Sequence, residues 1–255
     1  MPDAVAVIPE DASEELSMNQ YSRRDVIRTA AAVAVAPIVI STLASGTAMA
    51  QQAPSVVALQ HTPRPLPYAA GALKGLSERL IQSHWENNYG GSVRALNVVK
   101  QRLAEAMAVT DFPAYIYNDL KREHLLRTGS VILHELYFEN LGGSGTAGAD
   151  VREKLSGSFG SFDAWEAEYR RIGAGLGGGS GWVLLALNQH SGLLENYWLA
   201  DHAHSPPHAT PLLVMDMYEH SYQMDYGAAA ARYIDAFFDN INWEIVSRRL
   251  EPAAA

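Results

Sequence analysis

The amino-acid sequence predicts an α+β protein, in which an N-terminal long helical hairpin is followed by an α/β domain with a small three-stranded antiparallel sheet. Two observations predict this class. Apolar residues recur at helical spacing through residues 73–140, with a break at Asp111-Phe112-Pro113. Short apolar runs and glycine-rich turns follow. We therefore divide the chain into a signal peptide at residues 1–50, an N-terminal helical hairpin domain at 51–143 and a C-terminal α/β domain at 144–255.

The first 50 residues have the pattern of a twin-arginine export signal. Arg23-Arg24 precede a weakly apolar run at residues 29–43, and Ala48-Met49-Ala50 supplies a cleavage site. The alternatives are an uncut N-terminal anchor or a buried helix. Because the run is short for a membrane span and contains Pro37, we expect cleavage after Ala50. The mature protein would then be periplasmic, exported already folded and with its cofactor, and without a stable membrane anchor.

The hairpin is predicted from two helical segments. The first begins near Leu73, and Gly90-Gly91 is a candidate bend within it. The second is expected from near Asp119 to Asn140, because Gly142-Gly143 then stops the helical pattern. A short link joins the two, so they should pack as an antiparallel pair.

The C-terminal half is predicted to mix short helices and strands. A hairpin turn is expected at residues 189–192, between two apolar runs. A glycine-rich turn is expected at residues 173–181, where no P-loop or dinucleotide motif fits. The expected helices are 150–158, 162–172, 233–238 and 244–250, and the expected strands are 182–187, 193–199 and 212–215.

Composition limits the function. The 255 residues carry a net charge of −9 and are 48% hydrophobic, which gives enough apolar content for a core and disfavours nonspecific nucleic-acid binding. The chain has no cysteine, so thiolate metal sites, iron–sulfur clusters and a cysteine nucleophile are excluded. Any metal must therefore be bound by His, Asp or Glu.

Four residues form a candidate metal site. Asp216 and His220 are four residues apart, which places both side chains on one side of a helix or of a strand-to-helix corner. His84 and His134 each lie in an apolar helical stretch. Taken singly, each feature has an ordinary interpretation, as a surface pair or a hydrogen-bonded core histidine. Together, three imidazoles and one carboxylate suit a redox-capable first-row metal ion with an open coordination position.

Several motifs, in order along the chain, resemble those of the iron/manganese superoxide dismutase family. They cover nearly all of the chain after the signal peptide. The sequences that carry the resemblance are Leu66-Pro67-Tyr68, Phe159-Gly160-Ser161-Phe162, Gly179-Ser180-Gly181-Trp182, the stretch 210–222 around Asp216-Met217-Tyr218-Glu219-His220, Tyr233-Ile234-Asp235-Ala236-Phe237 and Asn242-Trp243.

The resemblance implies one iron or manganese ion per subunit, bound by His84, His134, Asp216 and His220. It also implies disproportionation of superoxide, a small anion, to dioxygen and hydrogen peroxide. A homodimer is expected, because Glu219 matches a glutamate that reaches the partner's ligand histidine, here His220. The ligands alone do not distinguish iron from manganese.

Residues expected around the metal depart from the family pattern. Ser92 replaces a gateway tyrosine, Asn88 a histidine and Tyr218 a tryptophan, whereas Trp182 is retained. Ser130 and Gly178 match two positions from which the family supplies a glutamine that hydrogen-bonds the metal's solvent ligand. These changes leave two alternatives: a catalytically weak or inactive periplasmic Fe/Mn-binding protein of the same fold, or a different redox enzyme with a widened pocket.

Charged residues at the expected entrance also differ. The family often has a lysine and an arginine there, and the corresponding positions are Asn87 and the alanine run 228–231. Attraction of an anion should therefore be weaker, with Arg94 and Arg232 as candidates to compensate.

A histidine-rich segment forms a separate candidate. His202, His204 and His208 lie in an expected loop that also contains Pro206-Pro207. One interpretation is an accessory copper or zinc site, and the other is a solvated polar loop.

Overall fold

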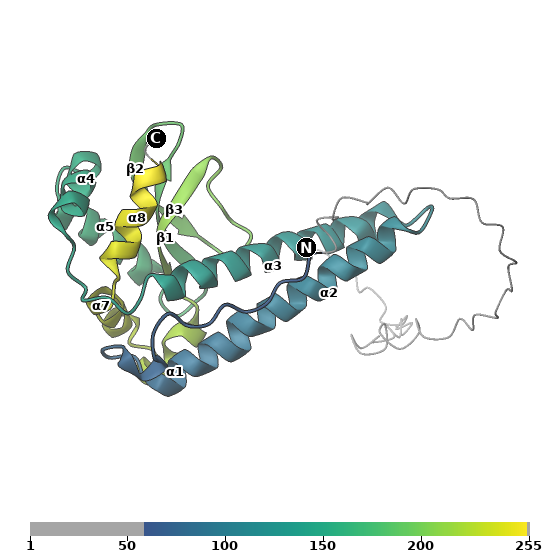
Figure 1. The fold of residues 1–255 in the computed structure, drawn as a ribbon, viewed down its shortest axis with the longest axis horizontal. Helices are drawn as coiled ribbons and strands as arrows, with labels where there is room; N and C mark the ends of the chain where they lie inside the picture. Colours follow the sequence, from purple (N-terminus) through teal and green to yellow (C-terminus); the bar gives the residue numbers. More distant parts are fainter. Residues whose placement is uncertain (1–58, 254–255) are drawn as a thin grey trace, which may run out of the picture. The chain divides into compact units, whose positions relative to one another are not determined.

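The computed structural model describes residues 59–253, so the predicted export signal at residues 1–50 and its predicted cleavage site lie outside the described residues. A long two-helix arm extends from a part that combines a small sheet with shorter helices (Figure 1). The elements confirm the α+β prediction. None of the helices in the described part of the chain combines the length and apolar character that a membrane span requires.

The first arm of the hairpin is one continuous helical stretch built from three segments. These are α1 (Glu78–Ser83), a π-helical turn η3 (His84–Tyr89) and α2 (Gly90–Met107). Ser77 caps its start, since the Ser77 hydroxyl accepts the N–H of Leu80 at 3.1 Å. The irregular turn lies just before the expected bend at Gly90-Gly91. π-helical turns inside α-helices are frequent at functional sites, and this one begins at a candidate ligand.

The second arm, α3 (Ala114–Glu139), packs beside α2 (Figure 1). It begins about five residues earlier than predicted. Pro113 is its N-cap, and a proline is well tolerated there because the first N–H groups of a helix have no intrahelical partner. A short 3-10 turn, η2 (Ala70–Ala72), precedes the hairpin.

The sheet has the strand order β2-β1-β3, and both pairings are antiparallel. Its strands are β1 (Trp182–Asn188), β2 (Leu193–Leu199) and β3 (Ala209–Asp216), which confirms the three predicted strands and the hairpin turn. The register shifts between Leu185 and Ala186, so that Leu212 is an extra residue in β3. The shift adjoins Pro211, whose missing N–H is tolerated because β3 is an edge strand.

Shorter helices surround the sheet. The helix α5 (Phe162–Leu176) contacts β1, and α8 (Trp243–Ala253) contacts β3, which α3 also contacts. The glycine-rich segment is only partly a turn, because Gly173–Leu176 completes α5; this corrects the predicted turn at 173–181. A short helix before α7 was not predicted. The helices are α4 (Ala149–Phe159), α5 (Phe162–Leu176), η4 (Glu219–Ser221), α6 (Gln223–Tyr226), α7 (Ala230–Asp239) and α8 (Trp243–Ala253).

Candidate metal centre

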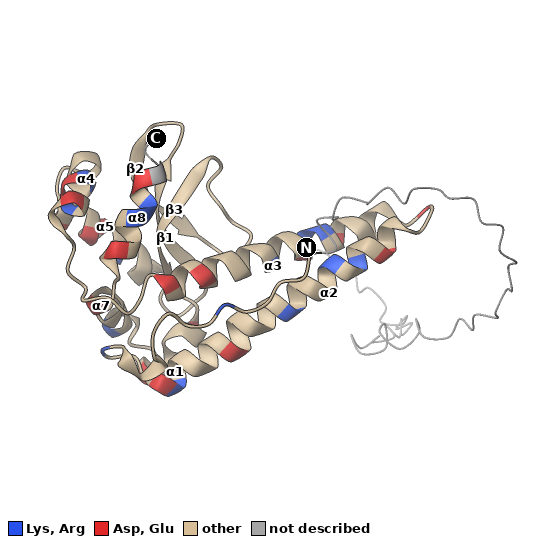
Figure 2. Ribbon diagram, viewed as in Figure 1, with Lys and Arg blue, Asp and Glu red and all other residues tan. Residues whose placement is uncertain are grey.

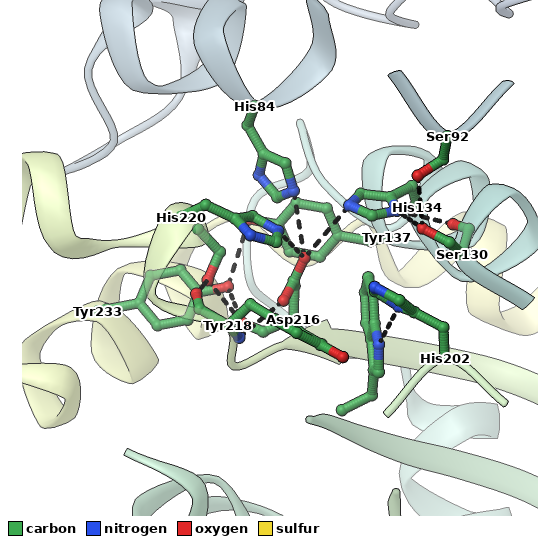
Figure 3. Close-up of polar contacts among 12 residues, drawn as sticks. His84, Ser92, Ser130, His134, Tyr137, His202, Asp216, Tyr218, His220 and Tyr233 are labelled. Atoms are coloured by element: carbon green, nitrogen blue, oxygen red, sulfur yellow. Dashed lines mark hydrogen bonds and ion pairs between the residues drawn. The ribbon is translucent and has the colours of Figure 1, made fainter. Parts of the chain in front are cut away.

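Four side chains converge where the base of the hairpin meets the end of β3. Each offers one ligand atom, and the four atoms lie within 4.8 Å of one another. The Asp216 Oδ2 atom lies 3.1 Å from His84 Nε2, 3.6 Å from His134 Nε2 and 3.2 Å from His220 Nε2 (Figure 3). His84 begins the π-helical turn, His134 lies on α3, Asp216 ends β3 and His220 lies in η4.

The orientation of the His134 ring is fixed by its own helix. Its Nδ1 atom lies 2.7 Å from the main-chain oxygen of Ser130, one turn earlier. A carbonyl oxygen can only accept, so Nδ1 carries the hydrogen and Nε2 presents a lone pair to the cluster. This is the tautomer that a metal-binding histidine requires.

The cluster fits a metal ion. His84, His134 and Asp216 are at most 1% exposed, and the buried His84 Nδ1, His84 Nε2 and His134 Nε2 atoms have no hydrogen-bond partner. Buried polar atoms without partners are rare and costly. Two such Nε2 atoms face the same carboxylate oxygen, so a cation among them would satisfy them together. Three imidazoles and one carboxylate suit iron or manganese.

The surroundings of the four side chains also favour the protonation states that metal binding needs. Desolvation lowers the pKa of His134 to about 3 and lowers the pKa of His84, so both rings are neutral near pH 7. Burial alone would raise the pKa of Asp216. Interaction with the His220 and His84 rings, whose Nε2 atoms lie 3.2 and 3.1 Å from its Oδ2 atom, outweighs burial and holds the pKa of Asp216 well below its usual range. Neutral imidazoles and an ionised carboxylate are the forms that bind metals.

Hydrogen bonds hold Asp216 in place. Its Oδ1 atom accepts the N–H of Tyr218 at 2.9 Å. Its main-chain oxygen accepts the Ser221 hydroxyl at 2.9 Å and the buried Tyr233 hydroxyl at 2.7 Å. The Tyr137 hydroxyl lies 3.3 Å from that of Tyr233, and the Tyr137 ring packs 5.2 Å from the His84 ring. Thus the carboxylate oxygen that faces the histidines has little freedom to move.

A cavity of about 400 Å³ leads to the cluster and meets it on the side of His134 and His220. Asn88, Ser92, Ser130 and Tyr218, which were expected near the metal, all line it. We call these four residues and His202 the cavity wall. The residues that line the cavity are Asn87, Asn88, Gly91, Ser92, Arg127, Ser130, His134, His202, Tyr218 and His220.

Two serines in the cavity wall form a buried pair. Their hydroxyl oxygens lie 2.8 Å apart, and the Ser130 hydroxyl also lies 3.4 Å from His134 Nδ1. The pair therefore joins the cavity directly to the ring of one candidate ligand (Figure 3).

The structure does not bring His202, His204 and His208 together. Among residues 59–253, the only group of three or more His, Asp or Glu side chains that could hold a metal ion is the four-residue cluster above. His204 Nδ1 instead lies 2.9 Å from the Asp201 carboxylate. His202 turns into the cavity: its ring stacks on Tyr218 with centroids 4.6 Å apart, and its Nδ1 atom accepts the Trp182 indole N–H at 3.0 Å. His202 therefore belongs to the site, and the geometry gives an accessory metal centre no support.

Two other expectations about the surroundings need correction. Gly178 is not among the residues that line the cavity, and its N–H donates to the Tyr222 hydroxyl at 2.9 Å. Neither Arg94 nor Arg232 lines the cavity; the arginine that does is Arg127, on α3. Trp182 is buried with its ring 5.1 Å from that of His134, as expected for a residue beside the cluster.

Gly129 was a missed signal for the position of His202. A Cβ atom at Gly129 would clash with the main-chain oxygen of His202. Only glycine lets the His202 loop approach α3 this closely. A glycine in the middle of an otherwise helical pattern could have indicated a close backbone approach.

The helical hairpin and the small sheet together position three imidazoles and one carboxylate around a single point. This arrangement is that of a mononuclear metalloprotein. A family model described as iron/manganese superoxide dismutases, C-terminal domain, matches residues 147–249. An iron superoxide dismutase from Cupriavidus metallidurans is 49% identical over 190 residues, covering 74% of this chain and 96% of the relative. The protein belongs to the iron/manganese superoxide dismutase family.

Other relatives are named for either metal. An iron superoxide dismutase from Aquifex aeolicus is 35% identical, covering 71% of this chain and 87% of the relative. A manganese superoxide dismutase from Haloferax volcanii is 32% identical, covering 74% of this chain and 94% of the relative. The family therefore includes proteins named for each metal, in agreement with a site that fits one iron or manganese ion per subunit.

Proposed function

We propose that this protein disproportionates superoxide to dioxygen and hydrogen peroxide, using one iron or manganese ion bound by His84, His134, Asp216 and His220. One observation carries the proposal: four ligand atoms of suitable chemistry converge at the inner end of a cavity. When bound, the ion supplies a one-electron couple that one superoxide reduces and a second superoxide oxidises. The remaining steps depend on the chain's own residues.

The cavity defines the side from which substrate approaches. His134 and His220 line it, whereas His84 and Asp216 do not. Superoxide would therefore arrive between the rings of His134 and His220, and the Asp216 carboxylate would remain shielded from the incoming anion. The Tyr218 ring, stacked 5.2 Å from the His220 ring, forms one side of this approach.

Formation of hydrogen peroxide consumes two protons, and the cavity wall holds groups that can donate hydrogen bonds to the reduced oxygen. His202 accepts the Trp182 N–H at Nδ1, so the neutral ring carries its hydrogen on Nε2. Burial lowers the pKa of His202, which favours that neutral form. The Ser92 and Ser130 hydroxyls supply two further exchangeable protons. We assign to these three residues the orientation of substrate and the delivery of protons.

We also propose that two copies form a dimer through the surface around η4. Glu219 is exposed there, and the neighbouring His220 side chain is 25% exposed although it is a candidate ligand. A partner's glutamate could cover this ring and accept a hydrogen bond from it. Analytical ultracentrifugation of the wild-type protein and of Glu219→Ala tests this: loss of the dimer in the variant supports the contact, and a wild-type monomer excludes it.

The location of the protein remains a prediction from residues 1–50. We propose export to the periplasm by the twin-arginine route, with cleavage after Ala50. N-terminal sequencing of the protein recovered from periplasm should begin at Gln51. Replacing Arg23 and Arg24 with lysine should leave the uncleaved chain in the cytoplasm, and unchanged export in that variant would contradict the proposal.

A second candidate function is a redox reaction on a small organic anion. The observation that favours it is the cavity volume of about 400 Å³, many times the roughly 30 Å³ share of a water molecule, which is close in size to a diatomic anion. Ser92 and Gly91 leave this space open, since neither has a large side chain.

Superoxide decay measured on the mature 51–255 protein, normalised to bound metal, tests the proposed activity. We expect fast decay that tracks bound iron or manganese and is lost in His134→Ala. His204→Ala is the matched control, because His204 is an exposed histidine outside the cavity. Full metal occupancy with decay no faster than that of His134→Ala would contradict a dismutase, leaving the organic-anion reaction or metal binding alone.

A further inference from the structure

Arg127 occupies the outer end of a row of side chains that leads to the metal centre. Arg127, Ser130 and His134 lie on one face of α3, three and four residues apart. All three line the cavity. The Arg127 side chain is 35% exposed, whereas Ser130 and His134 are 1% exposed, so the row runs from solvent to the cluster. Seven residues of helix place Arg127 about 10 Å from His134 along the axis.

Arg127 is also the only Lys or Arg among the residues that line the cavity, and no Glu is among them. The mature chain as a whole opposes an anion, since residues 51–255 hold 16 Lys and Arg against 22 Asp and Glu, a net charge of −6. Lys and Arg are interspersed with Asp and Glu along the hairpin, rather than forming one basic surface (Figure 2). A single cation at a polar opening therefore dominates the local field that an approaching anion meets.

Glu123 moderates this charge. It lies one helical turn before Arg127, and its Oε2 atom accepts from Arg127 Nε and Nη2, each at 3.2 Å. The contact restrains the guanidinium at the opening and cancels part of its charge. Because both side chains are partly exposed, the cancellation is incomplete and depends on salt.

We propose that Arg127 is the anion-capture residue of this cavity and draws superoxide toward the face of the cluster formed by His134 and His220. Glu123 limits the strength of this attraction. The inference rests on the proposed function for the identity of the anion. Arg127 acts on the approach of substrate and touches none of the four candidate ligands, so metal content should not depend on it.

Stopped-flow superoxide decay with the metal-loaded mature protein, over a series of ionic strengths, tests the proposal. For Arg127→Gln we expect a second-order rate constant about three- to tenfold lower at low salt, and a difference that shrinks as salt screens the charge. Arg127→Lys should recover part of the loss. Glu123→Gln should raise the constant about twofold, because it removes the opposing charge and keeps an acceptor.

Arg122→Gln is the matched control, because Arg122 lies on the same helix, pairs with Asp119 and does not line the cavity. Azide titration followed by the metal's optical spectrum gives a readout independent of turnover, and azide affinity should fall in Arg127→Gln by a similar factor. If the wild-type protein does not dismutate superoxide but Arg127→Gln still weakens azide binding, the proposed function is refuted and the role of Arg127 in anion capture is supported. Unchanged rate and azide affinity in Arg127→Gln, or equal losses in Arg122→Gln, would overturn the inference.

Discussion

The metal-ligand cluster and the cavity wall adjoin each other, yet they differ in how strictly they keep the residues the family resemblance implies. All four candidate ligands are of the expected type, and their atoms lie within 4.8 Å of one another. In the cavity wall, serines, an asparagine and a tyrosine stand at positions expected to hold other residues, and a histidine enters from a loop. Few types of side chain can bind a given metal ion, whereas several combinations of residues can form a hydrogen-bonded cavity wall.

This difference separates two properties. The cluster should decide whether a metal is bound, and the cavity wall should decide how fast the bound metal reacts. Changes in the cluster should therefore remove metal and activity together, while changes in the wall should alter rate at full occupancy.

The largest effect is expected from His84→Ala. Losing one of four ligands should weaken metal affinity by about 10³-fold, because each ligand carries a share of the binding free energy. Ser92→Ala, one helical segment away in the cavity wall, should keep its metal. Elemental analysis and competition with a chelator measure both variants. Retained affinity in His84→Ala would show that the ion is bound elsewhere.

Acidification should destabilise the metal-free fold by on the order of 3–5 kcal/mol. The pKa of His134 is about 3 in the folded protein and near 6.5 when unfolded, so the unfolded chain binds the proton more tightly. Stability from the neutral ring is present above pH 6.5 and is lost as pH falls toward 3. Urea unfolding of the apoprotein at several pH values measures this, and comparison with His134→Gln isolates the contribution. Equal pH dependence in both proteins would contradict it.

Gly129→Ala tests whether the close approach of the His202 loop to α3 holds the cavity wall in place. Its new methyl group would clash with the main-chain oxygen of His202, so we expect a loss of about 2 kcal/mol in stability and a slower reaction with metal retained. The control is Gly157→Ala on α4, where a Cβ atom would have no neighbour within 4 Å. Alanine there should raise the free energy of unfolding by about 0.5–1 kcal/mol. Thermal unfolding separates the two variants. Unchanged stability in Gly129→Ala would exclude the close approach of the His202 loop to α3.

His202→Ala should have the smallest effect: about tenfold lower activity at unchanged metal content. The reason is that it removes a hydrogen-bond donor beside the cluster and leaves all ligands in place. His204→Ala, in the same loop but outside the cavity, should retain full activity. Loss of metal in His202→Ala would instead make this residue part of the cluster.

Much of the fold followed from sequence patterns. The strand Leu193–Leu199 has the predicted bounds, because a turn that ends at Gly192 precedes a run rich in apolar residues. The start of α3 was misplaced, because helical spacing alone did not reveal how well Pro113 begins a helix. The π-helical turn at His84–Tyr89 has no comparable sequence signal, since its residues also fit an ordinary helix.

The candidate site divides in the same way. Residue type and spacing suggested Asp216 and His220, and the apolar helical stretches around His84 and His134 added two more candidates. The resemblance then implied that all four bind one metal ion. His202 was assigned to the wrong group because His204 and His208 are close in sequence, while its real neighbours, Trp182 and Tyr218, come from the sheet and the segment after it. Contacts between loops depend on packing that local spacing does not encode.

Anomalous X-ray diffraction at the iron and manganese absorption edges, on crystals of the metal-loaded protein, would show where the ion binds. We predict one peak per chain, about 2.0–2.2 Å from one atom each of His84, His134, Asp216 and His220. A peak in the loop that carries His204 and His208, or no peak at the four-residue cluster in protein with full metal content, would contradict metal binding by these four residues.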